Sequence, residues 1–150
     1  MSNGKTNVWA RRKARRALVQ ALYEWQLSEN SLANIRGSFH EGSALKKADV
    51  EFFDEILALA IHQASELDAS YEPLLDRKLT QLDQVERAVL RLACVEFTHR
   101  IDVPYAAVID EYVELAKTFG AQDSYKYING VLDKLARILR TVEVEAAKRG

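Results

Sequence analysis

The sequence predicts an all-α fold, a compact bundle of about six to seven helices. Only two prolines and six glycines interrupt its 150 residues. Apolar residues recur mostly at spacings of three and four, which is the period of an amphipathic helix. A hydrophobic content of 48% with 29% charged residues is typical of a globular domain, and a chain of this length can bury a core of its own.

The first half of the chain is expected to hold three or four of these helices. The first runs from about Asn7, an N-cap candidate, to about Ser28, because its apolar residues fall within an arc of about 140°. A polar stretch follows, with room for one short helix around Ile35. Asp49 is placed to cap a long helix that reaches Leu67. Pro73 then starts a short one.

The second half carries clearer boundaries. Asp83 and Glu86 have the spacing of a capping box and open a strongly apolar helix. Pro104 starts the next helix, and Gly120 is placed to end it. Asp123 is expected to cap the last clear helix. Residues 141–150 lack helical periodicity, so we expect a single domain over 1–140 and a frayed or disordered tail over 141–150.

Charge is distributed unevenly along the chain. The formal net charge is −1, yet the first 23 residues hold six basic side chains and no acid. The remaining 127 residues therefore carry a charge of about −7. A basic segment on an acidic body indicates a polyanion-binding end.

A helical wheel divides this basic segment. Arg12 and Arg16 lie within about 40° of each other, with Tyr23 between them on the side away from the apolar arc. Basic side chains neutralise phosphates, and an exposed tyrosine can stack on an unpaired base. The alternative is a solvated, charged helix face; the absence of a local acid favours nucleic-acid binding. The candidate RNA-binding residues are Arg11, Arg12, Lys13, Arg15, Arg16 and Tyr23.

The residues do not form a catalytic constellation. Glu96 and His99 have the Glu-x-x-His spacing of helical di-iron sites, but those sites need two copies. The single cysteine, Cys94, lies in an apolar run and is expected to be a buried filler. No glycine-rich phosphate loop is present. We therefore expect a protein that is not an enzyme and has no cofactor and no metal.

Targeting signals are also missing from the sequence. No apolar run approaches the roughly 20 residues of a membrane span, and the basic N-terminus is not followed by the apolar core of a signal peptide. One cysteine cannot form an internal disulfide. We expect a cytoplasmic protein without a membrane partner.

The segment over 119–134 is the second distinctive region. Tyr127 lies at the edge of an apolar stripe, where aromatic residues are common in interfaces. A boundary tyrosine that covers the core fits the spacing equally well.

Several blocks together resemble the bacterial NusB family. They occur in the order typical of that family and span nearly the whole chain; they are residues 10–15, 19–27, 85–91, 102–105, 114–117, 119–124 and 129–134. The resemblance implies an all-helical RNA-binding transcription factor. Such proteins pair with NusE, a small-subunit ribosomal protein, recognise single-stranded boxA RNA, and act with other Nus factors in the RNA polymerase elongation complex, notably on ribosomal RNA operons.

The resemblance also assigns roles to individual residues. Arg11, Arg12, Lys13 and Arg15 match the arginine-rich RNA-binding motif, and Tyr23 matches an aromatic residue that contacts RNA. Only helix geometry argues for Arg16. The positions that match the NusE-facing surface are Glu86, Asp123 and Tyr127, and Tyr127 replaces a more usual phenylalanine.

Two other classes of function compete with this one. NusB-like domains also form the N-terminal part of some ribosomal RNA cytosine methyltransferases, but this sequence has no further domain or glycine-rich cofactor loop. A pure protein-interaction module is the other alternative, in which the basic helix meets an acidic partner. A homodimer would be able to cover the RNA surface.

Overall fold

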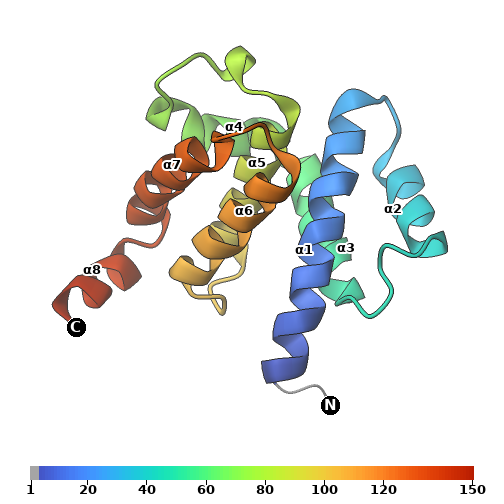
Figure 1. Ribbon diagram of the computed structural model, residues 1–150, viewed down its shortest axis with the longest axis horizontal. Coiled ribbons are helices and arrows are strands. Elements are labelled where there is room, and N and C mark those ends of the chain that lie inside the picture. Colours follow the sequence, from blue (N-terminus) through green and yellow to red (C-terminus); the bar gives the residue numbers. More distant parts are fainter. Residues whose placement is uncertain (1–3) are drawn as a thin grey trace.

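The computed structural model describes residues 4–150, with side chains from residue 8 onward, so the side chain of Lys5 lies outside the described set. Figure 1 shows an all-helical molecule, as predicted. The described residues form eight α-helices, one more than the upper expectation: α1 (Gly4–Leu27), α2 (Leu32–Glu41), α3 (Val50–His62), α4 (Ala64–Tyr71), α5 (Gln84–His99), α6 (Tyr105–Phe119), α7 (Ser124–Leu139) and α8 (Thr141–Arg149).

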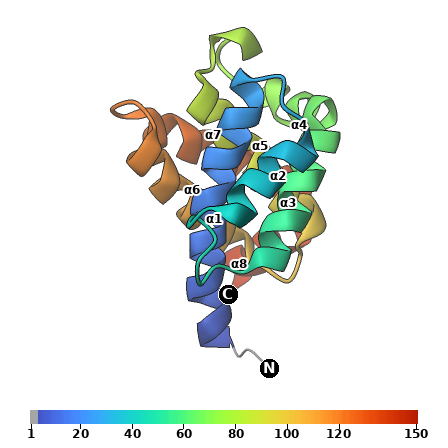
Figure 2. The same ribbon diagram turned by 90° about the vertical axis from the view of Figure 1, so that its right-hand side faces the viewer.

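The core is organised around α5. This helix is buried from Ala88 to Phe97, including the charged Arg91 and Glu96, which is typical of a helix enclosed by others. It contacts α1, α3, α4, α6 and α7. Figures 1 and 2 show α1, α2 and α3 on one side of it and α6 and α7 on the other. The outer face of α1 is thereby left to solvent.

The predicted helix boundaries around α5 and α6 are confirmed. The Asp83 carboxylate accepts the Glu86 N–H at 2.8 Å, and the Glu86 carboxylate accepts the Asp83 N–H at 3.0 Å, which is a capping box. Helix α6 begins directly after Pro104 and ends at Gly120. A Cβ atom at Gly120 would lie 2.6 Å from the Ala116 carbonyl oxygen, so the chain turns there only with glycine.

Two predictions about the first half are wrong. The long helix expected between Asp49 and Leu67 is broken at Gln63 into α3 and α4. Apolar positions continue through the break, so periodicity does not reveal it. The helix expected at Pro73 is replaced by two single 3₁₀ turns, Glu72–Leu74 and Leu79–Gln81.

The C-terminal segment is helical, whereas a frayed or disordered tail was expected. One carboxylate explains the difference: Glu143 of α8 accepts the backbone N–H of Tyr105 at 2.9 Å and a hydrogen bond from Arg140 at 2.6 Å. It thereby satisfies a first-turn amide of α6, which has no side-chain cap of its own. Val144 is buried beside it. The contact between Glu143 and Tyr105 links residues 38 apart, beyond the reach of a local pattern.

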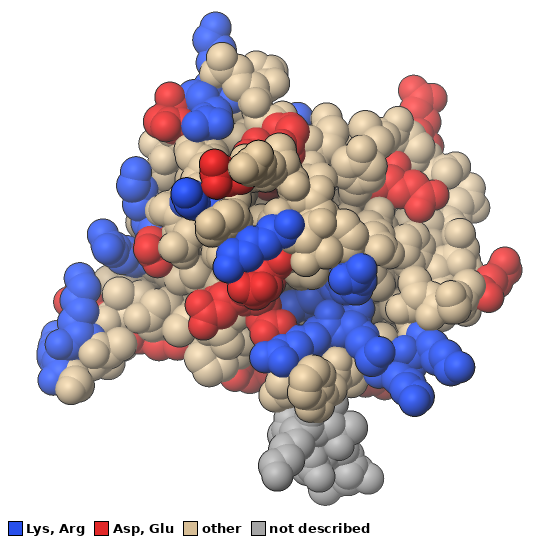
Figure 3. All heavy atoms as spheres, in the orientation of Figure 1, with Lys and Arg blue, Asp and Glu red and all other residues tan. Residues whose placement is uncertain are grey.

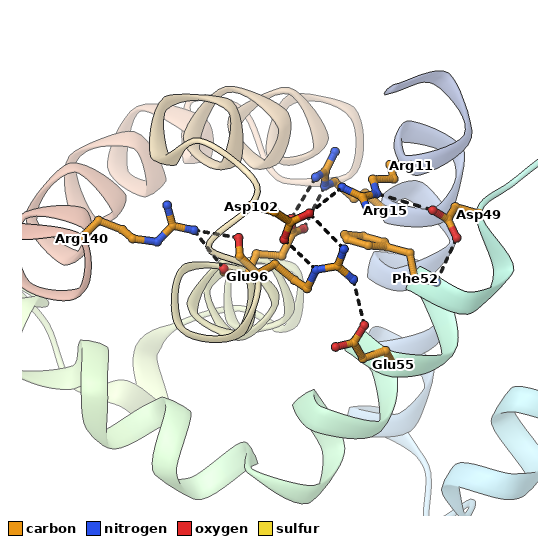
Figure 4. Close-up of polar contacts among 9 residues, drawn as sticks. Arg11, Arg15, Asp49, Phe52, Glu55, Glu96, Asp102 and Arg140 are labelled. Atoms are coloured by element: carbon orange, nitrogen blue, oxygen red, sulfur yellow. Dashed lines mark hydrogen bonds and ion pairs between the residues drawn. The ribbon is translucent and has the colours of Figure 1, made fainter. Parts of the chain in front are cut away.

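A buried ionic cluster joins the two sides of the bundle. Glu96 of α5 is fully buried and accepts two hydrogen bonds from Arg15 of α1, at 2.8 and 2.9 Å. The Tyr112 hydroxyl of α6 donates to the same carboxylate. Arg140 donates to the carbonyl oxygens of Phe97, Glu96 and Arg100 at the end of α5. Figure 4 shows Arg15 and Arg140 converging on Glu96 from opposite sides.

Removal of Arg15 is expected to destabilise the fold. Arg15→Met leaves the Glu96 carboxylate buried without its cation, which costs about 3–5 kcal/mol in the free energy of unfolding. Urea denaturation measures this loss. The double variant Arg15→Met/Glu96→Met should lose less than the single one, since no charge is then stranded. Arg12→Met, on the exposed face, should change stability by no more than about 1 kcal/mol.

Candidate nucleic-acid interface

The structure separates the predicted RNA-binding residues of α1 into inward and outward groups, as the helical wheel indicated. Arg15 is 5% exposed and held by Glu96. Burial alone lowers the pKa of Arg15, but the hydrogen bonds and charge of Glu96 outweigh it and raise the pKa above its usual value. Arg15 is therefore charged, and its guanidinium is bound by Glu96 within the protein.

Arg11 is also occupied. Its guanidinium lies 3.5 Å from the Asp49 carboxylate and 3.3 Å from that of Asp102, and it sits 4.9 Å from the centre of the buried Phe52 ring. Hydrogen bonds from Arg100, with a smaller contribution from Arg11, lower the pKa of Asp102 to about 2. Figure 4 shows this arrangement. Arg11 thus joins α1 to α3 and to the loop that precedes α6.

Arg12 lies on the outward face but has a partner. It pairs with Glu111 of α6 at 3.0 Å, and its guanidinium lies 5.1 Å from the centre of the Trp9 ring. Half of its side chain stays exposed. The acids that pair with Arg11, Arg12 and Arg15 come from 38 to 99 residues away. A search for acids near the basic segment in sequence therefore could not find them.

Lys13 and Arg16 are the outward residues without an acidic partner. Both are exposed, and within the described part of the chain no carboxylate pairs with either. Arg16 rests on the ring of Phe119 at 5.1 Å from its centre. The role of Arg16 in RNA binding, for which only helix geometry argued, stays a prediction.

The loop between α2 and α3 brings two further cations to these residues. Lys46 and Lys47 line a hollow of about 590 Å³ together with Lys13, Arg16 and Gln20. We call these five residues the cationic groove. Figure 3 shows the blue side chains gathered over α1 and this loop. No acidic residue lines the groove.

Backbone contacts fix this loop against α1. The Asp49 N–H donates to the Ala10 carbonyl oxygen at 3.0 Å, while the Asp49 carboxylate caps α3 by accepting the Phe52 N–H at 3.0 Å. Leu45 is buried next to the two lysines, and Lys47 adopts a left-handed φ of 64°. The sequence pattern did not predict that this loop would join the candidate site. The adjacent lysine pair just before a helix cap was the available signal.

Two aromatic side chains stand on the same outer surface. Tyr23 is 39% exposed, as predicted, and Trp9 is 65% exposed. Fourteen residues separate them, which is about 21 Å along a helix. The outer face of α1 thus offers an aromatic group toward either end, with Lys13 and Arg16 between.

The three residues predicted to face NusE come together at the α5–α7 junction. Glu86 is 7% exposed and accepts a hydrogen bond from the Ser124 hydroxyl at 2.8 Å. Asp123 precedes Ser124 and is exposed. The prediction that Asp123 caps α7 through its side chain is wrong: its φ is 67°, its carboxylate accepts no amide hydrogen bond, and that carboxylate pairs with Lys126 at 3.4 Å. Glu86 therefore holds the start of α7 against α5 through Ser124. Asp123 is the exposed acid at this junction.

Tyr127 lies one helical turn beyond Asp123 and is half-buried. The Arg77 guanidinium covers its ring at 3.8 Å from the centre, which is a close cation–π contact. Among the described residues its buried hydroxyl has no partner in hydrogen-bonding geometry, although Asp76 lies close enough to influence its pKa. Burial raises the pKa of Tyr127 above its usual value.

The described residues hold no grouping of three or more His, Cys, Asp or Glu that is suited to a metal ion. Nor do they include a helix both long and apolar enough to cross a membrane. Cys94 is buried, as predicted, and burial raises the pKa of its thiol to about 11.

The protein is thus a helical bundle with two candidate surfaces. One is the cationic groove between α1 and the α2–α3 loop, and the other is the α5–α7 junction with Asp123 and Tyr127. The NusB family model matches residues 12–137, so the chain belongs to the NusB family. It is 49% identical to the transcription antitermination protein NusB of Alcanivorax borkumensis over 94% of both chains. It is 51% identical to that of Yersinia pestis, over 87% of this chain and 95% of the relative. A solved NusB structure from T. maritima matches with a TM-score of 0.74 at 29% identity, over 84% of this chain and 89% of that one.

The unpaired Tyr127 hydroxyl yields a stability prediction. Tyr127→Phe removes a buried polar atom that has no partner, so the free energy of unfolding should rise by about 1 kcal/mol. Urea denaturation of the two proteins measures the change. The comparable variant Tyr112→Phe removes a hydroxyl that is bonded to Glu96, and it should instead lower stability by about 1 kcal/mol or more. Equal effects at the two tyrosines would contradict the assignment.

Proposed function

We propose that this protein is a transcription antitermination factor that binds single-stranded boxA RNA together with NusE. In this role it promotes ribosomal RNA transcription within the RNA polymerase elongation complex and catalyses no reaction. The relatives named transcription antitermination protein support the role. The observation that supports RNA binding is the cationic groove, which brings together four cations and no acid from two separate segments.

The groove suits a single strand better than a duplex. Its cations lie on one helix and one adjoining loop, which provides a short track for a phosphate backbone. Tyr23 continues the same face of α1 and supplies a ring on which an unpaired base can stack. Arg12 adds a partly exposed charge, whereas Arg11 and Arg15 act by holding α1 in place.

Loss of two groove cations should weaken RNA binding in a salt-dependent way. For single strands each phosphate contact contributes about −0.7 to the slope of log K against log salt. Lys13→Ala/Arg16→Ala should therefore flatten the slope for a boxA oligoribonucleotide by about 1.4 and lower affinity at low salt. Fluorescence anisotropy from about 50 to 200 mM salt measures both quantities.

The matched control removes the same charge elsewhere. Lys134 and Arg137 are exposed on α7, outside the groove. Lys134→Ala/Arg137→Ala changes the net charge equally, and it should leave the slope within about 0.3 of the wild-type value, less than half of one phosphate contact. An equal loss in both double variants would indicate nonspecific attraction to charge and would contradict a groove at α1.

The NusE surface is proposed to lie at the α5–α7 junction. Tyr127 and the overlying Arg77 present a flat cationic–aromatic surface, and Asp123 provides an exposed carboxylate beside it. Tyrosine and arginine are enriched in the energetically dominant parts of interfaces. Glu86 contributes indirectly because it fixes Ser124 at the start of α7.

A charge placed at Tyr127 should prevent docking. Tyr127→Asp replaces the half-buried ring with a carboxylate and is expected to abolish complex formation with NusE in size-exclusion chromatography. Circular dichroism should still report a helical protein. Tyr127→Phe keeps the ring and should bind NusE within about threefold of wild type. Equally strong NusE binding by Tyr127→Asp would contradict the proposed surface.

A gel shift with boxA RNA, with and without NusE, separates this proposal from its main alternative. Tighter RNA binding in the presence of NusE supports the antitermination role. A module that only binds proteins would leave the RNA unshifted under both conditions.

A further inference from the structure

Trp9 is a large apolar side chain that packing within the protein does not explain. It is 65% exposed, on the outer face of α1 one turn before Arg12. The Arg12 guanidinium lies 5.1 Å from the centre of its ring, and Glu111 pairs with the same guanidinium at 3.0 Å. With one ring face against Arg12 and most of the residue still exposed, the indole is held in place yet accessible.

The tryptophan stands at the edge of a second hollow, distinct from the cationic groove. We call it the tryptophan hollow; it lies between α1 and α6, has a volume of about 490 Å³, and is lined by Trp9, Arg12, Lys13, Arg16, Glu111, Glu114 and Leu115. Lys13 and Arg16 line both hollows and therefore form the ridge between them. Figure 3 shows basic side chains meeting acidic ones where α1 lies next to α6.

We propose that the tryptophan hollow binds one unpaired nucleobase of the RNA, stacked on Trp9, while the cationic groove holds the adjoining backbone. This inference rests on the proposed function and adds a base-binding site to it. The ridge cations would then contact phosphates between the two hollows. Neither composition nor the family resemblance pointed to Trp9.

The linings of the two hollows decide which part of a nucleotide each accepts. The cationic groove has four cations and no acid, which favours phosphate. The tryptophan hollow sets two carboxylates, from Glu111 and Glu114, against its three cations, and Glu111 already pairs with Arg12 at 3.0 Å. Its lining therefore attracts an anion less strongly than the acid-free cationic groove does. Its Trp9 ring and Leu115 side chain favour a flat, uncharged group. A base is the part of RNA with these properties, and its N–H groups can donate to a carboxylate.

The experiment compares RNA with an anion that has no bases. Wild type and variants are titrated with a fluorophore-labelled boxA oligoribonucleotide and with inorganic polyphosphate. Trp9→Ala should weaken RNA binding by about 5- to 150-fold, the equivalent of one stacked base. Polyphosphate affinity should stay within about twofold. Val8→Ala, which trims the neighbouring exposed apolar residue, is the matched control and should bind RNA as wild type does.

Fluorescence provides a second readout that does not depend on affinity. The chain has two tryptophans, Trp9 and the half-buried Trp25. RNA should quench the emission of wild type, and Trp9→Phe, which leaves only Trp25, should lose that quenching while binding RNA within about fivefold of wild type. Polyphosphate should quench neither protein.

Each result bears on the inference. Unchanged RNA affinity for Trp9→Ala, with unquenched wild-type emission, overturns the base site and leaves the proposed RNA-binding function standing. An equal loss of RNA and polyphosphate affinity also overturns it, because Trp9 would then act only by placing Arg12. Failure of the wild-type protein to bind RNA, with and without NusE, overturns both the proposed function and this site.

Discussion

A carboxylate buried away from water requires a cation and further donors, and Glu96 obtains them from helices that are distant in sequence. Arg15 reaches it from α1 and Tyr112 from α6, while Arg140 binds the carbonyl oxygens at the same end of α5. A bidentate pair tolerates little rotation. The contact therefore fixes how α1 is turned about its own axis, and with it the direction of every other side chain on that helix.

This orientation of α1 explains why neighbouring basic residues differ in burial and in pairing. Successive helical residues are about 100° apart, so Arg15 facing inward places Arg16 toward the outside and Arg11 at the boundary. The inward charges find acids and serve the fold, whereas Lys13 and Arg16 keep their charge available. Exposure and pairing thus distinguish residues that an arginine-rich motif treats alike.

Most of the fold was predictable because its signals are local. The capping box at Asp83, the glycine at position 120 and the periodicity of α1 each operate within a few residues. The remainder depends on contacts across the bundle. The break at Gln63 leaves the apolar pattern intact, and α8 is held by Glu143, which reaches across to α6. In the candidate site, the wheel separated the faces of α1 correctly, but spacing gave no means of placing Lys46 and Lys47 beside Lys13.

The hydrogen bond from the Asp49 N–H to the Ala10 carbonyl has a consequence for the kinetics and thermodynamics of recognition. This bond attaches the loop that carries Lys46 and Lys47 to α1, which carries Lys13 and Arg16. The cations of the groove are therefore held in place before any ligand arrives. A preformed site loses little conformational entropy on binding, so more of each phosphate contact appears as affinity. In the proposed function, such a surface would capture a strand at the rate of encounter, with no folding step to delay it, which would suit a transcript that is presented only briefly as it emerges.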